Sequence, residues 1–244
     1  MKTPPARAPV SSFRPSGKLP AQFNPQFERI AQMAQAELKQ QGVVGMESIM
    51  GIIQIAGQIS TPEFVKMFTE GRANRRAVKD TDMTKYAEIL ISTTEGLEGL
   101  LDEKVKDIIS DIGVDLDKYQ ASCEYWARAN PQFGMMAMGQ MEMLKAAVES
   151  NNDVTRDLIV EYLNFCIEQY PNIEAEKVGE IPAGLIKKSL LDDLAFETYG
   201  IEEEDILKYM QKQGIAAMQD QELFGLLQTF QTNLQNDMMS EMQG

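Results

Sequence analysis

Residues 97–112 read LEGLLDEKVKDIISDI, and the spacing of their apolar residues decides the fold class. These apolar residues follow one another at intervals of mostly three and four positions, which places them on one face of an α-helix. Acids and lysines occupy the opposite face. The stretch therefore predicts an amphipathic helix with one buried side, formed by Leu97, Leu100, Leu101, Val105, Ile108, Ile109 and Ile112.

Helical signals continue on both sides of this stretch. Asn24-Pro25 places a capping residue before a proline, and Ser60-Thr61-Pro62-Glu63 has the form of another helix start. No alternating run is long enough to indicate a strand. The sequence predicts an all-α fold of about ten helices, packed as helical hairpins into an irregular array or bundle. The expected helices cover residues 26–41, 46–55, a stretch starting at 62, 97–112, 115–129, 131–150, 153–169, 185–199, 202–213 and 221–238.

A basic, proline-rich arm is expected before the helices. Residues 1–24 contain five prolines and four basic residues, and the first acid is Glu28. Prolines at this density forbid a continuous helix, so the arm is predicted to be extended. Residues 25–244 are expected to form a single helical domain, with 25–112 and 113–244 as its candidate sub-parts.

Two patterns raise the question of a helical repeat. Residues 24–27 (NPQF) recur as residues 130–133, and Gly42-Val43, Gly113-Val114 and Gly200-Ile201 each precede a pair of expected helices. The two patterns follow different registers. Glycine followed by an apolar residue is also an ordinary way to end a helix. A repeat of three hairpins and a non-repetitive array both stay open.

The composition excludes several kinds of catalytic site. The chain has no histidine, so histidine-dependent nucleophilic sites and histidine-ligated metals are absent. Its two cysteines cannot form a four-thiolate zinc site, and no glycine-rich phosphate loop occurs. The acids at 202–205 stand at a helix start, where a solvated cap is the usual interpretation. We expect no catalytic residue, no cofactor and no resident metal, and hence a protein that is not an enzyme.

Calcium binding is the one metal function kept as an alternative. Asp111, Asp115 and Asp117 are spaced like the opening of an EF-hand loop. Leu116 and Ser122, however, occupy the positions where that loop needs glycine and glutamate. A regulatory binding module that responds to calcium is therefore the alternative function.

Methionine is frequent, with 16 residues, and it crowds the expected helix 131–150. Flexible thioethers can repack against different partners, so Met135, Met138 and Met141 are candidate partner-binding residues. A helix that is apolar on nearly all sides is normally buried, however. A core helix is the favoured interpretation, and a plastic groove for a partner helix is the alternative.

Charge is distributed unevenly along the chain. Residues 1–80 carry 11 basic and 6 acidic side chains, and residues 81–244 carry 12 and 31. The basic residues either pair with acids of the same chain or meet the acidic part of a second copy in head-to-tail assembly. The candidate partner-binding residues are Arg7, Arg14 and Lys18 of the arm and Arg72, Arg75, Arg76 and Lys79 of a helix.

The net charge of −14 argues against nucleic acid and anionic membranes as partners, because phosphate would be repelled. The most apolar stretch, 43–59, is interrupted by Glu47, Gln54 and Gln58, so no membrane insertion is expected. Two thiols without a disulfide framework and the lack of an apolar secretion signal predict a cytoplasmic protein, with import into an organelle left open. The expected function is a non-enzymatic structural or scaffold subunit that binds other proteins, itself included.

Overall fold

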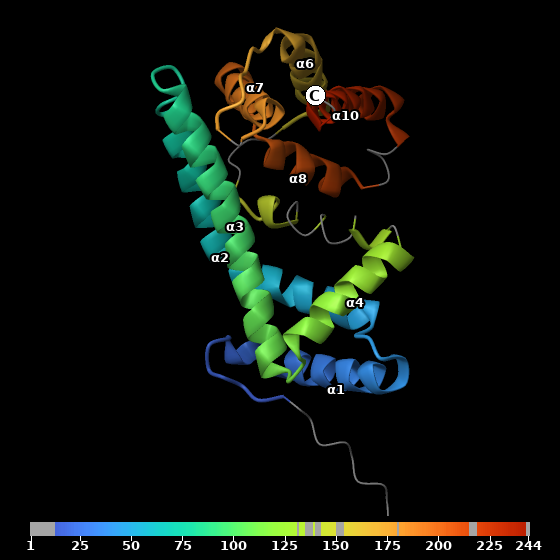
Figure 1. The fold of residues 1–244 in the computed structure, drawn as a ribbon. Coiled ribbons are helices and arrows are strands. Elements are labelled where there is room, and N and C mark those ends of the chain that lie inside the picture. Colours follow the sequence, from blue (N-terminus) through green and yellow to red (C-terminus); the bar gives the residue numbers. More distant parts are fainter. Residues whose placement is uncertain are drawn as a thin grey trace, which may run out of the picture. The chain divides into compact units, whose positions relative to one another are not determined.

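The computed structural model describes residues 13–130, 132–134, 139, 143–149, 154–179, 181–214 and 219–242, and residues 237–242 only as backbone. These residues form helices and connecting loops (Figure 1). They contain no strand, only an isolated bridge between Val178 and Ile181. The fold is all-α, as the sequence predicts.

Besides shorter helical stretches at 132–134 and 143–145, the described chain contains eight α-helices and two short 3-10 helices. They are η1 (Ala21–Phe23), α1 (Asn24–Gln41), α2 (Met46–Arg76), α3 (Met83–Asp111), α4 (Leu116–Ala129), α6 (Arg156–Gln169), η2 (Tyr170–Asn172), α7 (Ala183–Tyr199), α8 (Glu203–Gln213) and α10 (Gln221–Met242).

The chain divides into two compact units, each built from two separate stretches. Unit 1 contains Met1–Val65 and Gly96–Leu144, and unit 2 contains Lys66–Glu95 and Lys145–Gly244. The long helices α2 and α3 contribute residues to both units. This grouping does not follow the contiguous sub-parts suggested by the sequence, and the single-domain organisation stays a prediction.

One helix replaces two expected ones between residues 46 and 76. The sequence suggested an end at Ile55 and a new start at Pro62, but α2 continues through Pro62. Proline inside a helix has no N–H to donate to the carbonyl four residues earlier, and its ring clashes with that carbonyl. Together these effects destabilise a helix by about 3 kcal/mol. Ile52 and Phe64 on either side are fully buried, and their burial favours a continuous helix despite this defect.

Several helix ends follow local signals in the sequence. Gly42 adopts a left-handed conformation with φ 75°, and its N–H donates to the carbonyl of Leu38 at the end of α1. At the start of α4 the carboxylate of Asp115 accepts a hydrogen bond from the N–H of Lys118. Glycine tolerates positive φ and a short acid satisfies free N–H groups, so both ends were predictable.

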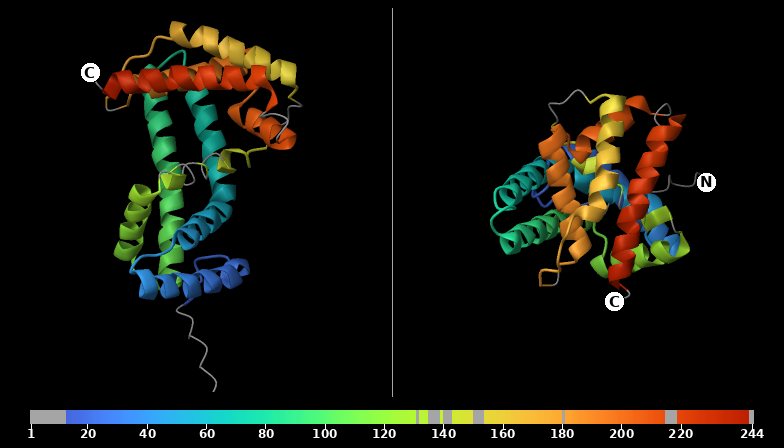
Figure 2. Two further views of the ribbon diagram at one scale, coloured as in Figure 1. Left: turned by 90° about the vertical axis from the view of Figure 1, so that its right-hand side faces the viewer. Right: turned by 90° about the horizontal axis from the view of Figure 1, so that it is seen from above.

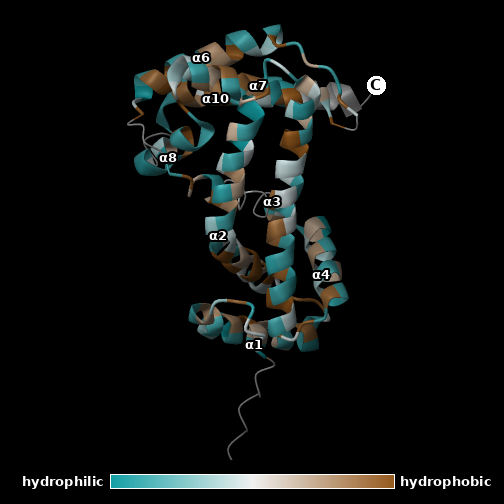
Figure 3. Cartoon of the chain, turned by 90° about the vertical axis from the view of Figure 1, so that its left-hand side faces the viewer, coloured by the Kyte–Doolittle hydropathy of each residue, from teal (hydrophilic) through white to brown (hydrophobic). Residues whose placement is uncertain are grey.

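Unit 1 packs α1, the first part of α2, the end of α3 and α4 around one apolar core. Ile108 and Ile112 of the stretch at 97–112 are fully buried there, which confirms the predicted buried face. Figure 3 shows that both hydrophilic and hydrophobic residues occur along the whole length of α3. Phe27 and Phe133, from the two NPQF segments, lie in this same core.

Unit 2 contains α6, α7 and α10, which contact one another and lie side by side in the right-hand view of Figure 2. The end of α2 and the beginning of α3 also belong to this unit. Gly71 lets these two helices approach, because a Cβ atom there would lie 2.4 Å from Oγ1 of Thr93. Tyr86 and Leu90 of α3 are buried with Ile186 of α7.

Candidate functional site

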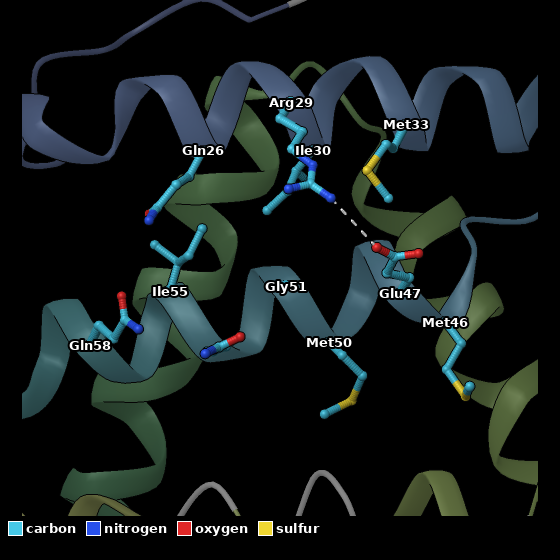
Figure 4. Close-up of a pocket in the computed structure, with 11 residues that line it drawn as sticks. Gln26, Arg29, Ile30, Met33, Met46, Glu47, Met50, Gly51, Ile55 and Gln58 are labelled. Atoms are coloured by element: carbon cyan, nitrogen blue, oxygen red, sulfur yellow. Dashed lines mark ion pairs between the residues drawn. The ribbon is translucent and has the colours of Figure 1, made fainter.

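A groove of about 510 Å³ lies between α1 and the first part of α2, within unit 1. In Figure 4, Gln26, Arg29 and Met33 extend from α1 toward α2, and Glu47 and Ile55 extend toward α1. The groove is lined by Gln26, Arg29, Ile30, Met33, Met46, Glu47, Met50, Gly51, Gln54, Ile55 and Gln58.

The groove is apolar at its base and polar at its edges. Ile30 and Ile55 are 7% and 6% exposed and form its base. The side chains of the three methionines are half-buried, whereas the three glutamines are exposed. An apolar centre inside a polar rim is the usual composition of a protein-binding surface. Because both walls are helices, the groove has the form of sites that accept a partner helix.

Four of the α2 residues that line the groove form a ladder with a spacing of four: Met46, Met50, Gln54 and Gln58. Residues at this spacing lie above one another on one helical face. Gly51, next to this ladder, keeps α1 close, because a Cβ atom there would lie 3.1 Å from Cδ1 of Ile30.

The connection between α1 and α2 is held by several hydrogen bonds. The carboxylate of Glu37 accepts hydrogen bonds from the N–H of Gly45 at 2.8 Å and from the hydroxyl of Ser48 at 2.7 Å. The indole N–H of Trp126 donates to the carbonyl of Val44 at 2.8 Å. An acid at the start of α2 also interacts favourably with the helix dipole. The two walls are therefore fixed without a bound partner.

Electrostatic effects in the groove itself are weak. Arg29 and Glu47 approach to 3.8 Å, but both side chains are 75% exposed, so the pair contributes little to stability. The sequence of unit 1 carries 10 basic and 13 acidic residues, a net charge of −3, whereas that of unit 2 carries 13 and 24, a net charge of −11. The groove thus lies in the less acidic unit.

Sequence reasoning did not identify this groove. Its alternative to a core helix was a plastic methionine surface at Met135, Met138 and Met141, and these three residues lie outside the described part of the chain. The spacing by four from residue 46 to residue 58 was the available signal. It was missed because the same residues also fit an ordinary amphipathic helix, and only the position of α1 turns this face into a groove.

The described part of the basic arm packs on unit 1. Phe13 lies with its ring centroid 5.9 Å from that of Phe27. The N–H of Arg14 donates to the carbonyl of Asp111 at 2.6 Å, and Nζ of Lys18 lies 3.0 Å from Oδ1 of Asp107. The side chain of Lys18 is 68% exposed, so this ion pair is weak. Arg7 lies outside the described residues.

The basic stripe on α2 pairs with acids of the same unit. Arg75 and Arg76 both bind the carboxylate of Asp193 on α7, at 2.9 and 2.6 Å. Arg76 also binds Glu202 at 2.7 Å, and Arg72 lies 2.7 Å from Glu204. The side chains of the three arginines are only 12–18% exposed. The fourth basic residue, Lys79, pairs with Glu197.

The acids at 202–205 are not a solvated cap, contrary to the usual interpretation of such a run. Glu204 is 1% exposed and Asp205 is 4% exposed. Glu202 and Asp205 form a capping box at the start of α8, in which each side chain accepts a hydrogen bond from the other residue's N–H. Sequence alone could not show that Arg72 and Arg76 would lie beside this helix start.

Asp193 is fully buried and accepts hydrogen bonds from Arg75, Arg76 and the hydroxyl of Tyr86, the last at 2.8 Å. Burial alone would raise the pKa of this carboxyl. The hydrogen bonds from Arg75, Arg76 and Tyr86 outweigh burial and hold the pKa below its ordinary value of 3.8.

We expect Asp193 to contribute a pH-dependent part of the stability. A carboxyl whose pKa is lower in the folded state stabilises the fold above the unfolded-state pKa and loses that effect as pH falls through the folded-state pKa. The gap in free energy of unfolding between the wild type and Asp193→Asn should therefore be constant near neutral pH and shrink below about pH 4. Urea denaturation at a series of pH values measures this gap. A gap that does not change with pH would contradict the assignment.

Two of the three acids considered for calcium serve other roles in the described structure. The carboxylate of Asp111 accepts hydrogen bonds from the N–H of Ser16 at 3.1 and 3.2 Å, and that of Asp115 caps α4. Among the described residues, no group of three or more acids or cysteines is arranged to hold a metal ion. The calcium-responsive alternative stays a prediction.

Comparisons with known proteins return no match: no family model, no curated protein and no solved structure resembles this chain. No helix in the described ranges is both long and apolar enough to cross a membrane. The groove between α1 and α2 is accordingly the feature on which a function can be argued.

Proposed function

We propose that this protein is a non-enzymatic scaffold subunit that binds a basic amphipathic helix of another protein in the groove between α1 and α2. The observation that carries the proposal is the ladder from Met46 to Gln58, which lines a groove with fixed walls together with Ile30 and Met33 of α1.

The shape of the groove favours a helix as the occupant. Two helical walls present ridges of side chains, and a third helix can lay its own ridge between them. Its apolar residues would contact Ile30, Ile55 and the three methionines, whose thioethers adapt to side chains of different shape. The exposed amides of Gln26, Gln54 and Gln58 both donate and accept hydrogen bonds, so they suit the polar edges of such a helix.

The charge of the protein favours a basic occupant. The whole chain carries a net charge of −14 and unit 1, which holds the groove, carries −3; fields of this sign accelerate association with cations and slow association with anions. Five of the seven basic residues expected to mediate head-to-tail assembly pair with acids of the same chain, namely Lys18, Arg72, Arg75, Arg76 and Lys79. These pairs support the groove over head-to-tail contact as the mode of binding.

The experiment uses protein labelled with ¹³C on the methionine methyl groups and three synthetic helical peptides. The peptides share one apolar stripe and differ only in having basic, neutral or acidic polar faces. We expect the basic peptide to shift the signals of Met33, Met46 and Met50 and to bind with a Kd in the micromolar range, roughly tenfold tighter than the acidic peptide.

Met50→Lys is the test variant and Met83→Lys is its matched control, since Met83 is 39% exposed on α3 and does not line the groove. Met50→Lys should weaken binding of the basic peptide at least about tenfold. It places a positive charge, of the same sign as the peptide, at the apolar centre of the groove. The control should leave binding unchanged. Failure of all three peptides to bind, or equal effects of the two variants, would overturn the proposal.

A further inference from the structure

The sequence of α10 contains fourteen consecutive residues without a charge, LFGLLQTFQTNLQN at 223–236. The whole chain holds 37 acids and 23 basic residues, so a surface helix would ordinarily carry several of them. An uncharged stretch of this length is expected where a helix is buried on all sides or where its outer face meets another protein.

Only one face of α10 is buried within unit 2. Leu223 and Phe230 are 1% and 9% exposed, and Leu226, Leu227 and Leu234 pack beside them against the same core. The helix contacts α6 and α7 on this side. The opposite face is exposed, so complete burial within the described structure does not explain the lack of charge.

The exposed face consists of two adjacent rows. One row holds Gln228, Gln231 and Gln235 together with Phe224, which is 53% exposed. The neighbouring row holds Gly225, Thr229 and Thr232, all exposed. Residues three and four apart lie on one side of a helix, so each row is continuous along the axis.

The second row permits close approach of another backbone. A Cβ atom at Gly225 would meet nothing within 4 Å, so open space lies beside it. The hydroxyls of Thr229 and Thr232 donate to the carbonyls of Gly225 and Gln228, both at 2.8 Å. Because these donors are already satisfied within the helix, a partner need not supply acceptors for them.

We propose that this face of α10 binds the same face of a second copy of the chain, with the two helices antiparallel about a two-fold axis. In a two-fold interface a surface meets itself, so a charged residue near the axis faces its own charge. A glutamine faces an identical amide that both donates and accepts. The face therefore has the composition that self-pairing requires.

The net charge favours this face as the place where a second copy makes contact. Two chains of −14 repel each other wherever their acids approach, and the uncharged face minimises this repulsion. The fourteen-residue stretch is about 21 Å long at the helical rise, which is enough for a helix-pair contact at the centre of a dimer interface. This inference concerns unit 2 and does not depend on the groove in unit 1.

The test is a pair of charge variants at the centre of the face. One variant carries Gln228→Glu with Gln231→Glu, and the other carries Gln228→Lys with Gln231→Lys. An antiparallel pair brings residue 228 of one copy near residue 231 of the other. A dimer of either variant alone therefore places like charges next to each other. A mixed dimer, with one copy of each variant, places unlike charges next to each other.

Sedimentation equilibrium over a concentration series measures the outcome, and circular dichroism verifies that each variant is folded. We expect a dimeric wild type, at least about tenfold weaker association of each variant alone, and a restored dimer in the equimolar mixture. A wild type that stays monomeric, variants that dimerise as well as wild type, or a mixture that fails to restore the dimer would each overturn the proposal. Binding of the basic peptide to the groove should be unchanged in both variants, which separates this test from that of the proposed function.

Discussion

Replacing Asp193 by alanine is expected to lower the free energy of unfolding by about 3–5 kcal/mol. The carboxylate is fully buried and binds the guanidinium groups of Arg75 and Arg76, whose side chains are 12% and 18% exposed. Removing it leaves two largely buried cations without this partner and Tyr86 without its hydrogen-bond acceptor. Urea denaturation followed by circular dichroism measures the loss.

Asp157→Ala is the matched control for this change. Asp157 lies 3.5 Å from Arg156, but its side chain is 88% exposed, so its loss should change the free energy by less than about 0.5 kcal/mol. Asp193→Asn keeps the shape and one acceptor oxygen, and its effect should fall between the two. A loss below about 1 kcal/mol for Asp193→Ala would mean that this buried ion cluster does not hold α2 to α7.

Phe27→Ala is expected to cost about 3–5 kcal/mol through the cavity left in the core of unit 1. The ring is fully buried and lies 5.9 and 6.2 Å from the rings of Phe13 and Phe23. Because Phe13 belongs to the arm, the change should also loosen the arm. Faster hydrogen exchange at the amide of Ser16, which donates to Asp111, would report this loosening.

Tyr125→Ala removes another aromatic ring of unit 1 as the control. Tyr125 is 50% exposed on α4, so its truncation should cost less than about 1 kcal/mol and leave the exchange of Ser16 unchanged. Equal losses for the two substitutions, or an exchange rate at Ser16 that is insensitive to Phe27→Ala, would contradict the packing described for the arm.

The regular elements were predictable because their signals are local. The spacing of apolar residues at 97–112 defines a helical face by itself, and Asp115 and Gly42 end helices through hydrogen bonds and φ values that involve only neighbouring residues. Pro62 is the instructive exception. Its local preference is to start a helix, but the burial of residues on both sides of it is a tertiary effect that local signals do not contain.

The candidate sites depended more strongly on tertiary structure. The helical spacing of Arg72, Arg75 and Arg76 showed that they share a face, yet a solvent-facing stripe and a buried ion cluster have the same spacing. Asp193 is more than a hundred residues away in the sequence, and only the packing of α7 beside α2 brings it within 2.6–2.9 Å of Arg76 and Arg75.

The sequence by itself determined the all-α fold, the buried face of α3, several helix ends and the uncharged stretch 223–236 of α10, because periodicity, capping and composition act over a few residues. Tertiary structure alone decided that α2 passes through Pro62, that the basic stripe pairs with Asp193 and Glu202, and that the ladder beginning at Met46 forms one wall of a groove. The physical reason is that burial and pairing depend on which helices meet, and that choice is made by the free energy of the whole core.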